Sequence, residues 1–106
     1  MNETFVIADL FGEFCADGER AAEFRVATLE SLVSSGKSVF LDFQDVRGMN
    51  SSFSNALIAT LIENQGSDAI SRLRFLNCRE LTKLHIRSSI TLGLQLAEEA
   101  AARGPA

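Results

Sequence analysis

The sequence predicts one α/β domain, residues 1–106, with a small, mostly parallel β-sheet and crossover helices packed on it. Three short apolar runs, at residues 4–9, 38–43 and 72–76, are separated by stretches with helical character. Strands that alternate with helices in this way pair in parallel through right-handed crossovers. A length of 106 residues suits a single hydrophobic core, and neither a linker nor an internal repeat divides the chain.

The first strand and the first helix are marked by their composition and their end signals. Residues 4–9 begin with an apolar, β-branched run, and Gly12 follows them. Asp17 can cap the next helix, and the Ser-Ser-Gly sequence at residues 34–36 can end it. The helical period predicts one inward-facing stripe, made of Ala22, Val26, Leu29 and Val33.

The middle of the chain contains the expected central strand. Residues 38–43 are apolar at adjacent positions, which is typical of a strand covered on both faces. A helix is expected over residues 53–64, and it is apolar on two sides. Ile58 and Ile62 lie nearly opposite a first stripe made of Phe53, Leu57, Thr60 and Leu61. The second side either packs beneath neighbouring helices or is partly exposed as a docking surface.

Two further helices are expected after the third strand. Asn77 and Glu80 have the spacing of a capping box, so a short helix should follow through Leu81, Leu84 and His85. A separate last helix is expected over residues 90–103. The large core residues are expected to be Phe40, Leu41, Phe43, Leu57, Leu61, Phe75 and Leu84.

Charge is unevenly distributed along the chain. The net charge is −4, with −6 on residues 1–65 and +3 on residues 66–87. An acidic first half repels phosphate backbones, so nucleic acid is not an expected partner. The basic stretch is either a solvated face or a patch for an anion or a partner, and it contains Arg72, Arg74, Arg79, Lys83 and Arg87.

Several classes of protein are disfavoured by composition. No apolar run approaches the ~18 residues of a membrane span, and the first residues do not form a signal peptide, so a cytoplasmic protein without membrane contact is expected. Cys15 and Cys78 form no CxxC pair and His85 is the sole histidine. A disulfide framework, a metal site or a cofactor is therefore not expected.

The loop before the second predicted helix holds an unusual polar cluster. Asn50, Ser51 and Ser52 are three cap-forming residues at a helix start where one would suffice. The N-terminus of a helix has unpaired N–H groups and a partial positive charge, so a phosphate there would be stabilised. Plain N-capping is the alternative reading of the same residues.

Residues 39–53, Val-Phe-Leu-Asp-Phe-Gln-Asp-Val-Arg-Gly-Met-Asn-Ser-Ser-Phe, resemble the strand, loop and helix start of STAS domains, the anti-sigma factor antagonist modules. In that family a partner kinase phosphorylates the first serine of an Asp-Ser-Ser-Gly motif, and the resemblance assigns this position to Ser51, with Ser52 as a second candidate. Asn50 replaces the Asp and Phe53 replaces the Gly, so the chain is most similar to the divergent STAS-like branch of unknown function. The resemblance covers residues 38–94.

The resemblance implies a non-enzymatic interaction module of the anti-sigma factor antagonist type, switched by phosphorylation at Ser51. Its partner would be a protein, either a histidine-kinase-like ATPase or an anti-sigma factor, and a homodimer is left open. The expected docking surface also involves the 9–17 loop and consists of Asn50, Ser51, Ser52, Phe53, Ile58 and Ile62. The alternative function is sensing of an effector or small ligand, in a pocket lined by Phe11, Phe14 and Phe53.

Three chemical hypotheses depend on fewer residues. A hydrolase would use Ser51 with His85 as its base, and no second imidazole is present. A phosphoacceptor aspartate, Asp42 or Asp45, would need Asp9 as a metal ligand, and the chain lacks the acidic pair and a lysine after the third strand. A reactive thiol, Cys15 or Cys78, is the third hypothesis, because Cys78 lies near a predicted helix start with Arg79 next to it, which would favour the thiolate.

Overall fold

The structure, a computed structural model, describes residues 2–104 and contains a three-stranded parallel sheet. Its strands are β1 (Asn2–Val6), β3 (Ser38–Asp42) and β5 (Leu73–Leu76), in the spatial order β1-β3-β5. The predicted α/β fold and the central position of the 38–43 strand are both confirmed.

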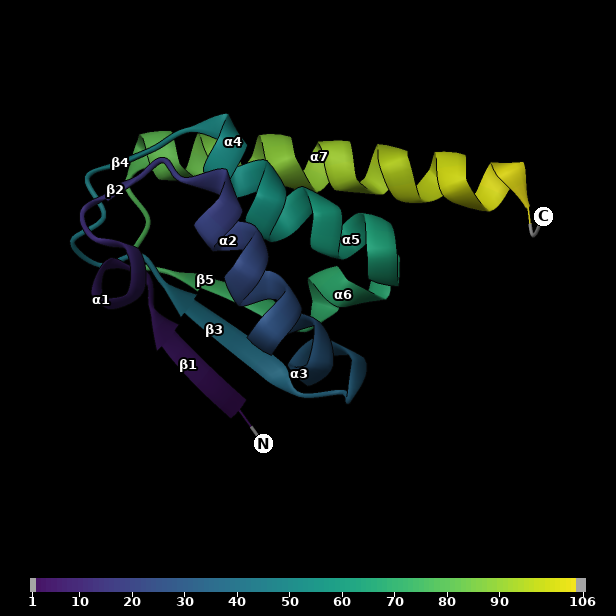
Figure 1. Cartoon of the computed structure of the whole chain (residues 1–106), viewed down its shortest axis with the longest axis horizontal. Helices are drawn as coiled ribbons and strands as arrows, with labels where there is room; N and C mark the ends of the chain where they lie inside the picture. The colour runs from purple at the N-terminus through teal and green to yellow at the C-terminus, as the bar shows by residue number, and fades with distance from the viewer. Residues whose placement is uncertain (1, 105–106) are drawn as a thin grey trace.

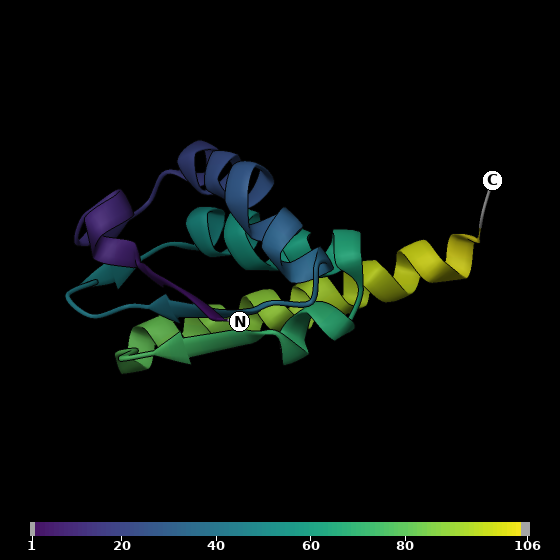
Figure 2. The ribbon, with the colours of Figure 1, turned by 90° about the horizontal axis from the view of Figure 1, so that it is seen from below.

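Two helical segments pack against one face of this sheet (Figures 1 and 2). The first comprises α2 (Gly18–Phe24), η1 (Arg25–Leu29) and α3 (Glu30–Ser34). The second comprises α4 (Ser51–Ser54), η2 (Asn55–Ala59) and α5 (Thr60–Gln65). Val39 and Leu41 are buried on the covered face, whereas Phe40 is only partly buried on the other. The expectation that the central strand is covered on both faces is therefore wrong.

The middle turn of each helical segment is π-helical. The Glu30 N–H bonds the carbonyl of Arg25, and the Thr60 N–H bonds that of Asn55, so each bond spans five residues. The extra residue in the first segment rotates its inward face, and Val26 is exposed while Ala21 is buried. The predicted stripe through Ala22 and Val26 is wrong because it assumed an uninterrupted 3.6-residue period.

Arg25 joins the two segments at the level of their π turns. Its Nη1 donates to the carbonyl of Ala56, whose usual α-helical donor, the Thr60 N–H, is bonded to another residue. Its Nε lies 2.8 Å from Glu30 Oε2. Glu30 adds two more bonds between the segments: its carbonyl accepts from Gln65 Nε2 at 2.8 Å, and its Oε2 accepts from Asn64 Nδ2 at 3.4 Å. The spare carbonyl of a π turn thus becomes an interhelical acceptor.

The end of the chain forms one helix, α7 (Glu80–Arg103), where two helices were predicted. The predicted capping box is also wrong, because Asn77 has a left-handed φ of 57° and the N-cap position is Arg79. Asn77 Nδ2 donates instead to Asp42 Oδ1 at 2.9 Å. Figure 1 shows α7 along one flank of the molecule, with its C-terminal half extending beyond α5.

The buried face of α7 consists mainly of small residues. Leu81 and Leu84 are 69% and 54% exposed, so the prediction of a buried Leu84 is wrong. The face that packs against η2 and α5 has Thr82, Ile86, Ser89 and Gly93. A Cβ atom at Gly93 would lie 2.9 Å from the Ala59 carbonyl oxygen, closer than ordinary contact. Small side chains therefore let the helices approach, and the larger leucines are left outside.

Ile58 and Ile62 are fully buried between these helices, each with 0% exposure. Their predicted place in a docking surface is wrong, because α7 packs on the second apolar side of the η2 and α5 segment. Of the predicted core, Phe40 and Phe75 are partly buried. The predicted residues that are fully or almost fully buried are Leu41, Phe43, Leu57 and Leu61.

Four short elements complete the fold. The first strand ends at Val6 and not at residue 9, because α1 (Ile7–Phe11) follows directly and ends at Gly12, whose φ is 87°. β2 (Phe14–Cys15) pairs in parallel with β4 (Gly48–Met49). α6 (Asp68–Ser71) precedes β5. The β2 and β4 pair is the element that builds the candidate site.

Candidate functional site

The candidate site, here called the serine corner, is the place where the 12–17 segment meets Asn50, Ser51 and Ser52 at the start of α4 (Figure 1). In the β2 and β4 pair, Cys15 lies opposite Met49. The Asn50 N–H donates to the Cys15 carbonyl at 3.1 Å, and Asn50 Nδ2 donates to the Ala16 carbonyl at 3.2 Å. These bonds fix the 12–17 segment beside the helix that carries Ser51.

Asn50 is the N-cap of this helix. Its Oδ1 accepts the Phe53 N–H at 2.9 Å, in the position where a cap side chain bonds a free amide of the first turn. Ser51 and Ser52 follow it and are both exposed. Within residues 2–104 no hydrogen bond involves the Ser51 hydroxyl. The cap therefore needs only Asn50, and the Ser51 hydroxyl faces solvent without a structural role.

A second helix begins at the same corner. Asp17 caps α2, as predicted, and its Oδ1 accepts the N–H groups of Glu19 at 3.0 Å and Arg20 at 3.3 Å. Gly18 faces Ser52 so closely that a Cβ atom there would lie 2.7 Å from Ser52 Oγ. Two helix N-termini, each with a partial positive charge, thus converge near the serine pair.

The surface around the serines combines an exposed aromatic ring with acidic side chains. Phe14 is 67% exposed, and Leu10 is also exposed. The two nearby arginines are engaged: Arg47 pairs with Glu13 at 3.5 Å, and Arg20 donates to the Leu10 carbonyl at 2.8 Å. The exposed carboxylates of this region are Asp9, Glu13, Asp17 and Glu19.

The three predicted phenylalanine rings do converge, but they leave little space. Phe11 and Phe53 pack edge to face with centroids 4.9 Å apart, and Phe53 is fully buried. The hollow lined by Phe11, Phe14 and Phe53 has a volume of about 140 Å³, below the roughly 300 Å³ at which ligand pockets begin. Phe53 therefore supports the corner from below and is not part of a docking surface, contrary to the prediction.

The residues of the other chemical hypotheses are not brought together. His85 is partly buried on α7, and in the described part of the chain no hydrogen bond joins it to Ser51 or to a carboxylate. The Asp42 carboxylate accepts from Asn77 Nδ2. Residues 2–104 contain no cluster of three histidine, cysteine or acidic side chains placed to hold a metal ion.

Neither thiol is activated. Burial raises the pKa of Cys78 above its ordinary value and Asp42 raises it further, while Lys83 opposes the shift. Burial also raises the pKa of Cys15, against the opposing charge of Arg20. A raised pKa means less thiolate at neutral pH, which is the opposite of what the thiol hypothesis requires.

We expect Cys78 to react slowly with iodoacetamide at pH 7. In a Cys15→Ala variant, iodoacetamide should alkylate Cys78 more slowly in the native protein than in urea. The midpoint of the pH dependence of the alkylation rate should also lie at higher pH in the native protein. The reason is the raised pKa, which keeps the thiol protonated over a wider pH range. Faster alkylation of the native state would show an activated thiol.

Sequence reasoning missed a hollow of about 500 Å³ between β5 and α7, whose lining includes Phe75, Ile86, Ile90, Lys83 and Arg87. The available signal was the basic stretch of residues 72–87, read as either a solvated face or a patch for an anion or a partner. Gly18, which lies against Ser52 at this corner, had no recognisable signal, whereas Phe14 was already predicted as a residue of the ligand pocket.

The structure thus defines a small parallel α/β domain. Its second helical segment, which comprises α4, η2 and α5, begins with the exposed Ser51. The family model described as STAS-like domain of unknown function (DUF4325) matches residues 20–83, more than half of the chain. The chain belongs to this STAS-like family, whose members are generally non-catalytic and commonly mediate protein interactions. The match begins earlier and ends earlier than the resemblance at residues 38–94.

Comparison with curated proteins and with solved structures gave no significant match. Among residues 2–104, no helix combines the length and the apolar character needed to cross a membrane.

Proposed function

We propose that the chain is a non-enzymatic protein-interaction module of the anti-sigma factor antagonist type, whose partner docks at the serine corner and is controlled by phosphorylation of Ser51. The observation that carries the proposal is the division of roles at the helix start: Asn50 makes the cap, so the Ser51 hydroxyl is exposed and free. The docking surface consists of Asn50, Ser51 and Ser52 with the exposed Leu10 and Phe14 side chains.

Phosphorylation at Ser51 would change the surface without unfolding the helix. It adds about −1.5 to −2 charges and three acceptor oxygens at a helix N-terminus, where an anion is tolerated. A partner that covers the exposed Phe14 ring would have to bury this charge in an apolar contact. Such a contact costs several kcal/mol, and each ~1.4 kcal/mol weakens the complex tenfold.

The STAS resemblance supports a histidine-kinase-like ATPase or an anti-sigma factor as the partner, in the cytoplasm. The kinase would phosphorylate Ser51, and Ser52 is the second candidate acceptor. Because Ser52 faces Gly18 at close range, Ser51 has more room for a phosphate. This difference favours Ser51 as the acceptor.

The test compares the binding of Ser51→Asp and of Ser51→Ala to a purified histidine-kinase-like ATPase of the organism that encodes this chain. We expect Ser51→Asp to raise the Kd at least about tenfold at a nearly unchanged Tm, and Ser51→Ala to bind like the parent chain. Isothermal titration calorimetry and thermal unfolding provide the two measurements.

Ser31→Asp is the matched control, because Ser31 is an exposed serine on α3, outside the proposed docking surface. It should bind the partner like the parent chain. Equal binding by Ser51→Asp and the parent, or tighter binding by Ser51→Asp, would refute the proposed switch.

A further inference from the structure

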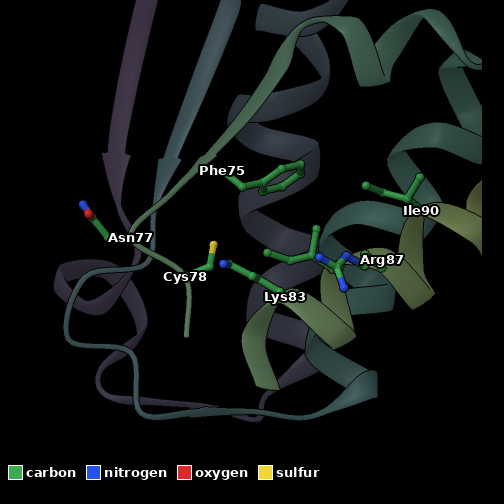
Figure 3. A pocket seen from close by; sticks show the side chains of 7 residues that line it. Phe75, Asn77, Cys78, Lys83, Arg87 and Ile90 are labelled. Carbon is green, nitrogen blue, oxygen red and sulfur yellow. The ribbon is translucent and has the colours of Figure 1, made fainter. Parts of the chain in front are cut away.

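An open groove separates β5 from the first turns of α7 (Figure 3). Its floor is apolar and is formed by Phe75, Ile86 and Ile90, while Lys83 and Arg87 stand at its rim. Its volume of about 500 Å³ lies within the roughly 300 to 1,000 Å³ of binding pockets. The groove lies outside the serine corner and shares no residue with it.

The groove lies along a free sheet edge. β5 pairs with β3 and is the last strand of its sheet. The Val39 N–H donates to the Arg72 carbonyl at 2.7 Å, and the Phe43 N–H donates to that of Leu76 at 2.8 Å. Residues 72, 74 and 76 therefore turn their backbone groups toward β3, and the alternation of a strand turns those of Phe75 outward.

Part of this edge is already occupied. Arg74 Nη1 donates to the Leu73 carbonyl at 3.0 Å, which covers one of the outward acceptors. Within residues 2–104 the outward N–H and C=O groups of Phe75 make no hydrogen bond, and they lie next to the apolar floor. An extended peptide placed along β5 could pair with them and direct alternate side chains into the groove.

The positive charges around the groove favour a partner with acidic side chains. Lys83 forms an exposed pair with Glu80 at 3.5 Å, and Arg87 forms no ion pair within residues 2–104. Arg74 and Arg79 add two more exposed positive charges near the same strand. Two copies of this chain that paired through β5 would bring these like charges together, which disfavours a homodimer here. Acidic side chains would complement them.

We propose that β5 binds an extended segment of a partner protein by β-augmentation, and that this segment alternates apolar residues with Asp or Glu. The apolar side chains contact Phe75, Ile86 and Ile90, and the acidic ones reach the surrounding Lys and Arg side chains. This interaction is independent of the serine corner, so the module can bind two proteins at once.

The test starts from a random peptide library displayed on phage and selected on the immobilised full chain. We expect enrichment of peptides with alternating apolar and acidic residues. Fluorescence anisotropy should show at least about tenfold weaker binding of a selected peptide to Arg87→Glu. Arg103→Glu, the same charge reversal near the far end of α7, should bind it like the parent chain.

A second measurement separates strand addition from charge alone. Binding of the selected peptide should slow amide hydrogen exchange at Phe75 and leave Ser51 and Ser52 unchanged, and N-methylation of the peptide amides that face β5 should abolish binding. Failure to enrich peptides, enrichment of basic peptides, or equal binding by Arg87→Glu would overturn the proposal. Self-association with protection of Phe75 would identify a homodimer interface instead.

Discussion

Replacing Leu41 with alanine is expected to lower the free energy of unfolding by about 2–5 kcal/mol. Leu41 is fully buried on the central strand, and the register places it between Phe5 of β1 and Phe75 of β5. The helical segments cover it on the remaining side, so the cavity cannot be filled from solvent. Urea denaturation with an unchanged m-value measures the loss.

Leu84→Ala is the matched control, because it deletes the same atoms from a side chain that is 54% exposed. Its effect should stay within about 0.5 kcal/mol. A loss below about 1 kcal/mol for Leu41→Ala, or equal losses for the two variants, would contradict the packing described here.

Replacing Gly93 with leucine is expected to lower the free energy of unfolding by about 3 kcal/mol, at the upper end for overpacked sites. A Cβ atom there would lie 2.8 Å from Ile62 Cβ and 2.9 Å from the Ala59 carbonyl oxygen. Neither neighbour is the end of a flexible side chain, so α7 must move away from η2 and α5. The better helix propensity of leucine recovers only about 1 kcal/mol.

Thr91→Leu controls for leucine on the same helix, because Thr91 is exposed. It should change stability by less than about 0.5 kcal/mol. If Gly93→Leu left the unfolding transition as stable as in the parent chain, the close contact between the two helices would be ruled out.

The parallel sheet could be predicted because each strand is marked by a short run of neighbouring residues in the sequence. The apolar runs at residues 38–43 and 72–76 are short, and the helices between them permit only parallel connections. The single helix α7 could not be predicted from such local patterns. Ser88 and Ser89 look like a break between helices, but the Ser89 hydroxyl donates to Ser54 or Asn55, each at 2.8 Å, within one continuous helix.

The candidate site was predictable only in part. The resemblance located Ser51, and the structure shows it exposed beside a cap made by Asn50. Ile58 and Ile62 were misplaced because a helix that is apolar on two sides does not reveal which side another element covers. That information resides in the small-residue face of α7, far along the sequence.

The π turns have a consequence for how chains of this family align. Ala21 and Leu29 both face inward although eight positions separate them, one more than two α-helical turns require. Deleting one residue from Arg25–Leu29 would turn this stretch into ordinary α-helix and keep both ends in phase with the core. A single-residue gap within 25–29 or 55–59 is therefore compatible with an unchanged fold. A gap within 55–59 would remove the spare Ala56 carbonyl that Arg25 binds, whereas a gap within 25–29 would leave that carbonyl in place.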